Sequence, residues 1–198
     1  MRTLVTLARP ALLALLMAAT PCVFAQANRA KWEMGVEMGY LKKIRHNSPL
    51  DYEIMPTQLL WRTPVQRELW RGAGGASLTL RHRLAIVAET YLKGAEDYYI
   101  GFAGAPVLEL WSADRKSALF YELGGGSGWT NSKNVVGGQG QDFTFNWFTQ
   151  LGARRQLSQK WALTGGAYFV HHSNLGMTKP NPGIDVLGVN FGVVMTLD

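Results

Sequence analysis

Residues 31–40, KWEMGVEMGY, alternate between large apolar side chains and small or charged ones. Successive side chains of a β-strand point to opposite faces, so a period of two predicts a strand with one apolar and one polar face. The apolar members are Trp32, Met34, Val36, Met38 and Tyr40.

The same alternation recurs along the rest of the chain and predicts eight strands in all. Eight antiparallel strands of roughly 10–14 residues are the smallest size of transmembrane β-barrel. The stretches 42–50, 131–141 and 174–183 predict longer loops, and 112–116 and 156–159 predict short turns. The predicted strands cover about 31–40, 51–62, 77–91, 98–111, 117–130, 142–155, 160–173 and 184–197.

The two faces of these strands differ enough to orient the barrel. One face carries Trp, Phe, Leu and Val, and the other carries Gly, Ala, Thr, Asn, Gln, Glu and Arg. The interior of an eight-stranded barrel is only just wide enough for side chains, so small and polar residues fit it better than large aromatic ones. The apolar face is therefore expected to point outward into lipid, as in an outer-membrane protein.

The composition agrees with a membrane β-barrel of one domain. The 198 residues include 22 glycines, with 11% aromatic and only 17% charged residues. The formal net charge of +6 is compatible with an anionic lipid surface. Nucleic acid is not expected as a partner, because the basic residues are scattered and the chain reads as exported.

Residues 1–25 are typical of a cleaved signal peptide. Arg2 and Arg9 precede and flank an apolar run at 11–19, which is too short to span a bilayer, and VFA at 23–25 offers a cleavage site. The mature domain is then 26–198, an outer-membrane β-barrel. Cys22, the only cysteine, falls in the signal peptide, so no disulfide is expected.

Three polar residues share the apolar face where the seventh predicted strand ends and the eighth begins. His171 and Ser173 have the parity of Phe169, and Asp185 has the parity of Leu187. If both termini lie in the periplasm, this point is at the outer surface of the membrane, where the outer leaflet contains lipopolysaccharide.

A serine becomes a nucleophile when a histidine takes its proton, and a carboxylate orients that histidine. His171, Ser173 and Asp185 supply these groups, and Asn174, Gly176 and Asn181 could donate hydrogen bonds to an oxyanion. Such a set cleaves esters. The alternative is a structural polar girdle at the headgroup level; three polar groups on a lipid-facing surface favour mutual pairing, because each alone would be costly there.

The stretch 171–185, HHSNLGMTKPNPGID, resembles the active-site segment of the lipid A 3-O-deacylase (PagL), or acyloxyacyl hydrolase, family of outer-membrane proteins. Those proteins carry a pattern close to H-x-S-N-x-G-x-x-x-P-N-x-G-I-E/D. The resemblance implies a serine esterase that removes the ester-linked hydroxyacyl chain at position 3 of lipid A.

The resemblance also implies roles for individual residues. Ser173 takes the place of the nucleophile, His171 of the general base and Asp185 of the orienting acid. Asn181 and the backbone at Gly176 match oxyanion positions, and Asn174 matches a polar position of the motif. The best-known members carry glutamate at the acid position, so Asp185 has roughly 1.5 Å less reach. The resemblance also places an aromatic residue, Trp147 of the sixth predicted strand, beside the site.

Other polar residues have structural interpretations. His172 has the opposite parity and is expected inside the barrel. Gly124–Gly128 lacks the Lys-Ser/Thr ending of a phosphate-binding loop and reads as a strand kept slim in a narrow barrel. No His, Cys and Asp cluster has metal-ligand spacing, so neither a metal nor another cofactor is expected. Lumen carboxylates paired with Arg or Lys are expected at Glu37, Glu89, Glu109 and Glu122.

Two other classes of protein remain open from the sequence. One is a non-enzymatic outer-membrane barrel, a structural anchor or adhesin whose site has decayed. The other is a soluble barrel that carries a ligand. The predicted partners of the esterase are the membrane and lipid A of lipopolysaccharide, and the sequence leaves a homodimer open.

Overall fold

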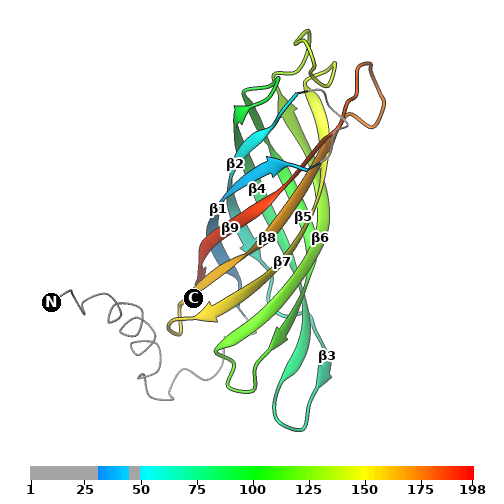
Figure 1. Cartoon of the computed structure of the whole chain (residues 1–198). Helices are drawn as coiled ribbons and strands as arrows, with labels where there is room; N and C mark the ends of the chain where they lie inside the picture. Colours follow the sequence, from blue (N-terminus) through cyan, green and yellow to red (C-terminus); the bar gives the residue numbers. More distant parts are fainter. Residues whose placement is uncertain (1–30, 45–49) are drawn as a thin grey trace, which may run out of the picture.

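The computed structural model describes residues 31–44 and 50–198, which form nine β-strands (Figure 1). The predicted signal peptide, 1–25, lies outside the described residues. The strands are β1 (Glu33–Lys43), β2 (Glu53–Arg62), β3 (Arg67–Arg71), β4 (Ser77–Lys93), β5 (Tyr98–Trp111), β6 (Ser117–Thr130), β7 (Phe143–Gln156), β8 (Trp161–Ser173) and β9 (Ile184–Thr196).

Eight of these strands close into an antiparallel barrel. From β4 to β9 each strand pairs with the next along the chain, β9 pairs with β1, and β1 pairs with β2. A further pairing of β2 with β4 closes the circle. The predicted all-β, eight-stranded antiparallel barrel is thus confirmed. Closure leaves none of these eight strands with a full-length free edge, which is what a lipid environment requires of a sheet.

The ninth strand, β3, was missed by the sequence pattern. It pairs with the first part of β4, on the same side as β2, and so continues the line of β2 beyond the barrel wall. Between them, the backbone N–H groups of Thr63 and Gln66 still donate to carbonyls of β4, while Pro64 has no N–H to donate. Five residues with a register shift show no usable alternation. The resulting β3–β4 hairpin extends past the end of the barrel (Figure 1).

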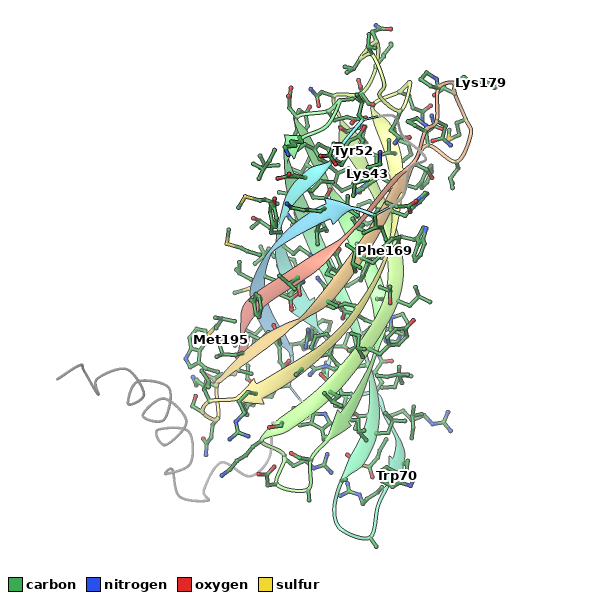
Figure 2. All side chains as sticks on the ribbon, in the orientation of Figure 1. Lys43, Tyr52, Trp70, Phe169, Lys179 and Met195 are labelled. Atoms are coloured by element: carbon green, nitrogen blue, oxygen red, sulfur yellow. The ribbon has the colours of Figure 1, made fainter. Side chains whose placement is uncertain are left out.

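The apolar face points outward, as the sequence predicted. Side chains stand out from the wall on the face seen in Figure 2, and every strand of the barrel carries exposed large apolar side chains. Leu151 and Phe191, for example, keep more than 60% of their surface exposed. A wall of this kind is stable in lipid rather than in water. No helix in the described part of the chain has the length and hydropathy to cross a membrane.

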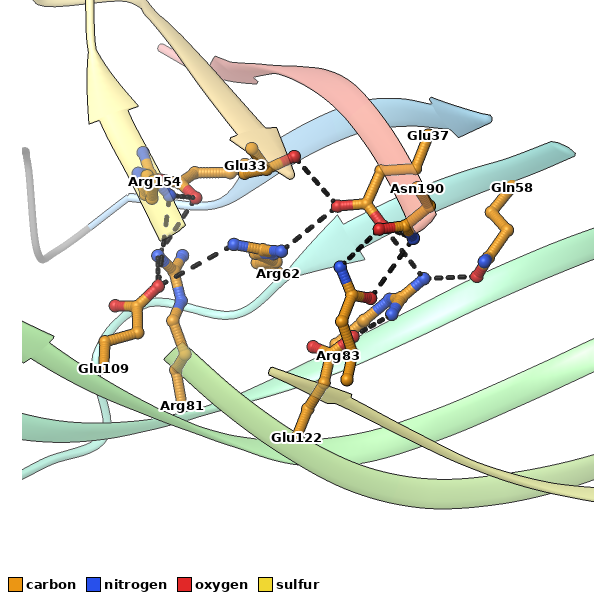
Figure 3. A network of polar contacts seen from close by, with 12 residues as sticks. Glu33, Glu37, Gln58, Arg62, Arg81, Arg83, Glu109, Glu122, Arg154 and Asn190 are labelled. Carbon is orange, nitrogen blue, oxygen red and sulfur yellow. Dashed lines mark hydrogen bonds and ion pairs between the residues drawn. The ribbon is translucent and has the colours of Figure 1, made fainter. Parts of the chain in front are cut away.

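The inward face carries a network of buried ion pairs (Figure 3). Glu33 accepts two hydrogen bonds from Arg154, at 2.6 and 2.8 Å, and one from Arg81 at 3.0 Å. Glu109 lies 3.7 Å from Arg81 and 3.8 Å from Arg62. Each charge is therefore opposed by the opposite charge at a place where water has little access.

A second part of the network lies next to the first. Glu37 lies 3.4 Å from Arg62 and 3.5 Å from Arg83, and Arg83 also binds Glu122 and Gln58. The prediction that Glu37, Glu109 and Glu122 are lumen carboxylates paired with arginine is confirmed. The fourth carboxylate, Glu89, lies 2.9 Å from a histidine, His172, at a higher level of the lumen.

The glycine run of β6 lets the backbones of two strands approach closely. A Cβ at Gly124 would lie 2.1 Å from the carbonyl oxygen of Gly104, and one at Gly126 would lie 1.8 Å from that of Phe102. Both distances are far below van der Waals contact. Side chains at these inward positions would force β5 and β6 apart, which supports the reading of the run as a slim strand.

The barrel has two different ends. The chain enters and leaves at one of them, the terminal end, where Leu197 N–H donates to the carbonyl of Trp32 at 2.8 Å. Short turns join the strands there. At the opposite end, the loop end, the connections 94–97, 131–142 and 174–183 lie beside the end of β1 and the start of β2 (Figure 1).

Replacing Glu33 by alanine should lower the free energy of unfolding by about 3–5 kcal/mol, because it leaves Arg154 and Arg81 buried with Glu109 alone to face both. Urea unfolding in lipid vesicles, followed by the heat-modifiable shift in gel mobility, measures this. The control is Glu68→Ala on β3, whose exposed pair with Arg71 should contribute only about 0–1 kcal/mol. Equal losses in the two variants would contradict a structural role for the lumen network.

Candidate active site

The candidate site lies where β8 and β9 meet the loop end of the barrel. The register of the two strands places His171 directly opposite Asp185, and the register of β7 and β8 places Trp147 opposite His171. Because β8 and β9 pair directly as antiparallel neighbours, the proximity of His171 and Asp185 follows from the pairing itself. Ser173 is the last residue of β8.

His171 and Asp185 are joined by a hydrogen bond. The distance from His171 Nδ1 to Asp185 Oδ1 is 2.8 Å. The Asp185 carboxylate is buried, whereas the His171 side chain keeps 24% of its surface exposed. The aspartate therefore reaches the imidazole although it is one methylene shorter than glutamate.

Ser173 has the same outward parity as His171 but is buried, with 7% of its surface exposed. It lies opposite Phe145 of β7. No hydrogen bond joins Ser173 Oγ to the imidazole in the described part of the structure. The two residues lie two positions apart at the end of β8, so their side chains project from the same face of the strand.

Aromatic rings line the exposed flank of the histidine. The centroid of the Trp147 ring lies 6.0 Å from that of His171 and 4.8 Å from that of Phe169. Trp147 thus stands beside His171, as its position in the sequence predicted. The surroundings of His171 on this side are apolar.

Asn174 organises the loop that follows β8. Its side-chain amide donates to the carbonyl of Gln139 in another loop and to Thr178 Oγ1 at 2.9 Å, and its Oδ1 accepts the N–H of Gly176 at 2.8 Å. Leu175 and Gly176 both have positive φ, 55° and 77°, the backbone sign that a type I′ turn requires at its two central residues.

The predicted oxyanion donors lie in this loop but differ in availability. The N–H of Gly176 is already bound to Asn174 Oδ1, so it is not a free donor in this structure. Asn181 Oδ1 accepts the backbone N–H of Asn174 at 3.0 Å, which leaves the amide nitrogen of Asn181 to donate. Of these two residues, Asn181 therefore has the more available donor.

His172 points into the lumen, as its parity predicted. Its Nε2 lies 2.9 Å from the Glu89 carboxylate, and its ring packs against that of Tyr99 with centroids 4.7 Å apart. The prediction that Glu89 pairs with Arg or Lys is wrong. The arginines of β4, Arg81 and Arg83, lie six or more residues nearer the terminal end, so a histidine from β8 is the basic group at the level of Glu89.

Two contacts of the site had no signal in the sequence. The carbonyl oxygen of Gln139 binds the Asn174 side chain, and a backbone acceptor leaves no mark on residue type. The Glu89–His172 pair joins strands that are not neighbours in the sheet. No group of three or more His, Cys, Asp or Glu residues in 31–44 and 50–198 is placed to hold a metal ion.

The closed barrel and its outward apolar wall define an integral outer-membrane protein. A model of the lipid A 3-O-deacylase (PagL) family matches residues 57–194, and the chain belongs to this family. The match spans β2 to most of β9 and includes all the candidate site residues. Family membership places the chain among outer-membrane hydrolases that act on lipid A.

A solved structure shows the same fold. The crystal structure of the outer membrane enzyme PagL superposes with a TM-score of 0.54 at 18% sequence identity, covering 81% of this chain and 97% of that one. No curated protein sequence matches. At 18% identity the structural similarity supports the fold, whereas the class of hydrolase is supported by the family match.

Replacing Asn174 by alanine should loosen the 174–183 loop, because it removes the donors and the acceptor that close it. A loss of about 1–3 kcal/mol would raise the hydrogen-exchange rate of the Gly176 and Met177 amides roughly tenfold or more. Hydrogen–deuterium exchange measures this on the folded barrel. Lys179→Ala, at an exposed position of the same loop, is the control, and unchanged exchange in the Asn174 variant would contradict the prediction.

Proposed function

We propose that this chain is a serine esterase that removes the ester-linked 3-hydroxyacyl chain from position 3 of lipid A in the outer leaflet. The observation that carries the proposal is the hydrogen bond between His171 Nδ1 and Asp185 Oδ1. His171 lies two residues before Ser173, on the same outward face of β8. This is the arrangement of base and orienting acid that a serine nucleophile needs.

The hydrogen bond assigns the two nitrogens of His171 different tasks. Nδ1 faces Asp185, so it carries the proton that the carboxylate accepts, and Nε2 is left with a lone pair as the base. As the imidazole takes the proton of Ser173, it becomes an imidazolium beside a buried carboxylate. Opposite charges in a site with little water attract strongly, which favours this proton transfer.

The reaction then follows the course of acyl transfer. Ser173 Oγ forms a bond to the acyl carbonyl carbon, and the carbonyl oxygen becomes an oxyanion that the Asn181 amide nitrogen would bind. The sugar oxygen leaves with the proton from His171, and the acyl group stays on Ser173. A water molecule, deprotonated by His171, attacks this ester, and the bond to Ser173 Oγ breaks as the serine takes the proton back from His171, which releases the hydroxy fatty acid.

The backbone N–H of Gly176 is a second candidate oxyanion donor. It would have to exchange its present acceptor, Asn174 Oδ1, for the oxyanion. Such an exchange requires the 174–183 loop to adjust when substrate binds, and Gly176 is exposed at the loop surface. Asn174 itself would hold the 174–183 loop in place and would not contact the substrate.

The position of the site in the membrane supports a lipid substrate. It lies at the loop end, opposite the terminal end, so termini in the periplasm would place it at the outer leaflet. The outward side chains below it, Trp147, Phe169 and Leu187, are apolar and partly exposed. An acyl chain attached at Ser173 would run along this apolar wall into the bilayer.

Replacing Ser173 by alanine should reduce deacylation by roughly 10⁴-fold or more while the barrel still folds, since the variant lacks the nucleophile. Mass spectrometry of lipid A from cells that express each variant measures the reaction, and heat-modifiable gel mobility measures folding. Ser127→Ala, on the outward side of β6, is the matched control. Undiminished loss of the acyl chain with the Ser173 variant would refute the mechanism, and an inactive wild type would favour a non-enzymatic barrel.

Replacing Asp185 by asparagine should lower kcat by about 10²- to 10⁴-fold, because an amide favours the wrong imidazole tautomer and does not stabilise the imidazolium. Asp185→Glu keeps a carboxylate and should stay within about tenfold of wild type. Initial rates of lipid A deacylation by the purified barrels test this pair. If the two variants were equally active, Asp185 would have no role as the orienting acid.

A further inference from the structure

A chain of buried hydrogen bonds crosses the loop end of the barrel and joins connections that are distant in sequence. It starts at Tyr52, where the chain enters β2, and reaches Glu96 in the 94–97 connection. From there it passes through the 131–142 connection to Asn174, the neighbour of Ser173. The residues between the two ends have no role in the chemistry described above.

Glu96 lies at the centre of the first part of this chain. Its side chain is 2% exposed. One carboxylate oxygen accepts the hydroxyl of Tyr52 at 3.0 Å, and the other accepts Ser132 Oγ at 2.5 Å. A buried carboxylate is stable only when such donors satisfy it, and bonds to a charged acceptor are stronger than those between neutral groups. Glu96 therefore holds two other segments firmly.

The second part of the chain leads from Ser132 to the site. The backbone N–H of Gln139 donates to Ser132 Oγ, and the carbonyl of the same residue accepts the side-chain amide of Asn174. Ser132, Gln139 and Asn174 are each at most 1% exposed. The hydroxyl that Glu96 fixes thus sets the position of the backbone to which Asn174 is bound.

Close backbone approaches show independently that the same segments interlock. A Cβ at Gly140 would lie 2.8 Å from the carbonyl oxygen of Pro180, and one at Gly138 would lie 2.5 Å from Ser132 Oγ. A Cβ at Gly94 would lie 2.6 Å from the ring of Tyr52. Because the backbones at these positions are closely packed, a displacement of one connection would displace the connection next to it.

We propose that Glu96 is a positioning residue for the nucleophile Ser173, acting through Ser132, Gln139 and Asn174. The inference rests on the proposed esterase function and adds a determinant of its rate. Asn174 is bonded to Ser173 along the chain, so its position decides where the serine hydroxyl stands relative to His171. A displacement of about 1 Å between reacting groups can cost as much as 10²-fold in rate.

A second contact between the same two connections provides a matched control. Asp97 and Asn131 exchange two hydrogen bonds, of 2.7 and 2.9 Å, at the exposed rim. This pair joins the 94–97 connection to the 131–142 connection, as Glu96 does, but it has no bond to Ser132 or Gln139. Asp97→Ala removes the 2.7 Å side-chain bond of this link without touching the chain that ends at Asn174.

The experiment compares the full-length barrels Glu96→Ala, Glu96→Gln, Ser132→Ala and Asp97→Ala with wild type. Heat-modifiable mobility reports folding, labelling by a fluorophosphonate reports the reactivity of Ser173, and kcat and KM are measured on lipid A. Glu96→Ala and Ser132→Ala should label, and turn over, about 10- to 100-fold more slowly with KM changed less than about threefold. Glu96→Gln, which keeps one acceptor, should recover part of the rate, and Asp97→Ala should stay within about twofold of wild type.

The outcomes separate this inference from the proposed function. If wild type is active and the folded Glu96→Ala and Ser132→Ala barrels react at its rate, the positioning role is wrong and the esterase assignment stands. A rise in KM alone would equally overturn it. If wild type is neither labelled at Ser173 nor deacylates lipid A, both fail together. Should Glu96→Ala not fold, wild-type rates in Glu96→Gln and Ser132→Ala would overturn the role.

Discussion

Ion pairing inside a narrow barrel is the constraint on which the rest of this structure depends. Charges in a lumen with little room for water must be met by opposite charges, because an unpaired buried charge is strongly destabilising. The pairing holds only if every strand keeps its polar face inward. A slip of one residue in any strand would turn charges into lipid and aromatic rings into the lumen. The groups concerned are Glu33, Glu37, Glu109 and Glu122 with Arg62, Arg81, Arg83 and Arg154.

The candidate site follows from the same alternation of faces. His171 falls on the outward side and His172 on the inward side, so adjacent histidines have unrelated partners. The first meets Asp185, and the second meets Glu89 in the lumen. The inward pair anchors the end of β8 to the far wall of the barrel, while the outward pair faces the apolar flank where a lipid would lie. One strand end thus combines a rigid support with access to the membrane.

The loop end adds what two strands could not supply. A strand end that protrudes from a barrel is free to fray, yet Ser173 and Asn174 are buried and tied down. The ties come from the adjacent 131–142 connection, through the backbone of Gln139, and from the 94–97 connection beyond it, through the carboxylate of Glu96. The pairing of β8 with β9 therefore aligns His171 with Asp185, and the hydrogen bonds between the loops fix the position of the segment that carries Ser173.

Much of this protein could be predicted from its sequence because alternation is a local property. The period of two in segments such as 31–40 gave eight strands, their outward faces and the antiparallel order. The antiparallel succession of the last two predicted strands, joined by the 174–183 loop, was enough to expect His171 near Asp185. The strand β3 was missed because five residues with an irregular register carry too little pattern.

The tertiary structure alone decided which inward groups lie at the same level of the lumen. That depends on how far neighbouring strands are staggered when the sheet closes, which no single strand encodes. Hence the partner of Glu89 is His172 rather than an arginine, and the N–H of Gly176 is occupied by Asn174. The bonds that tie Glu96 to Asn174 join residues far apart in the chain, partly through backbone atoms, and these become neighbours only in the closed barrel.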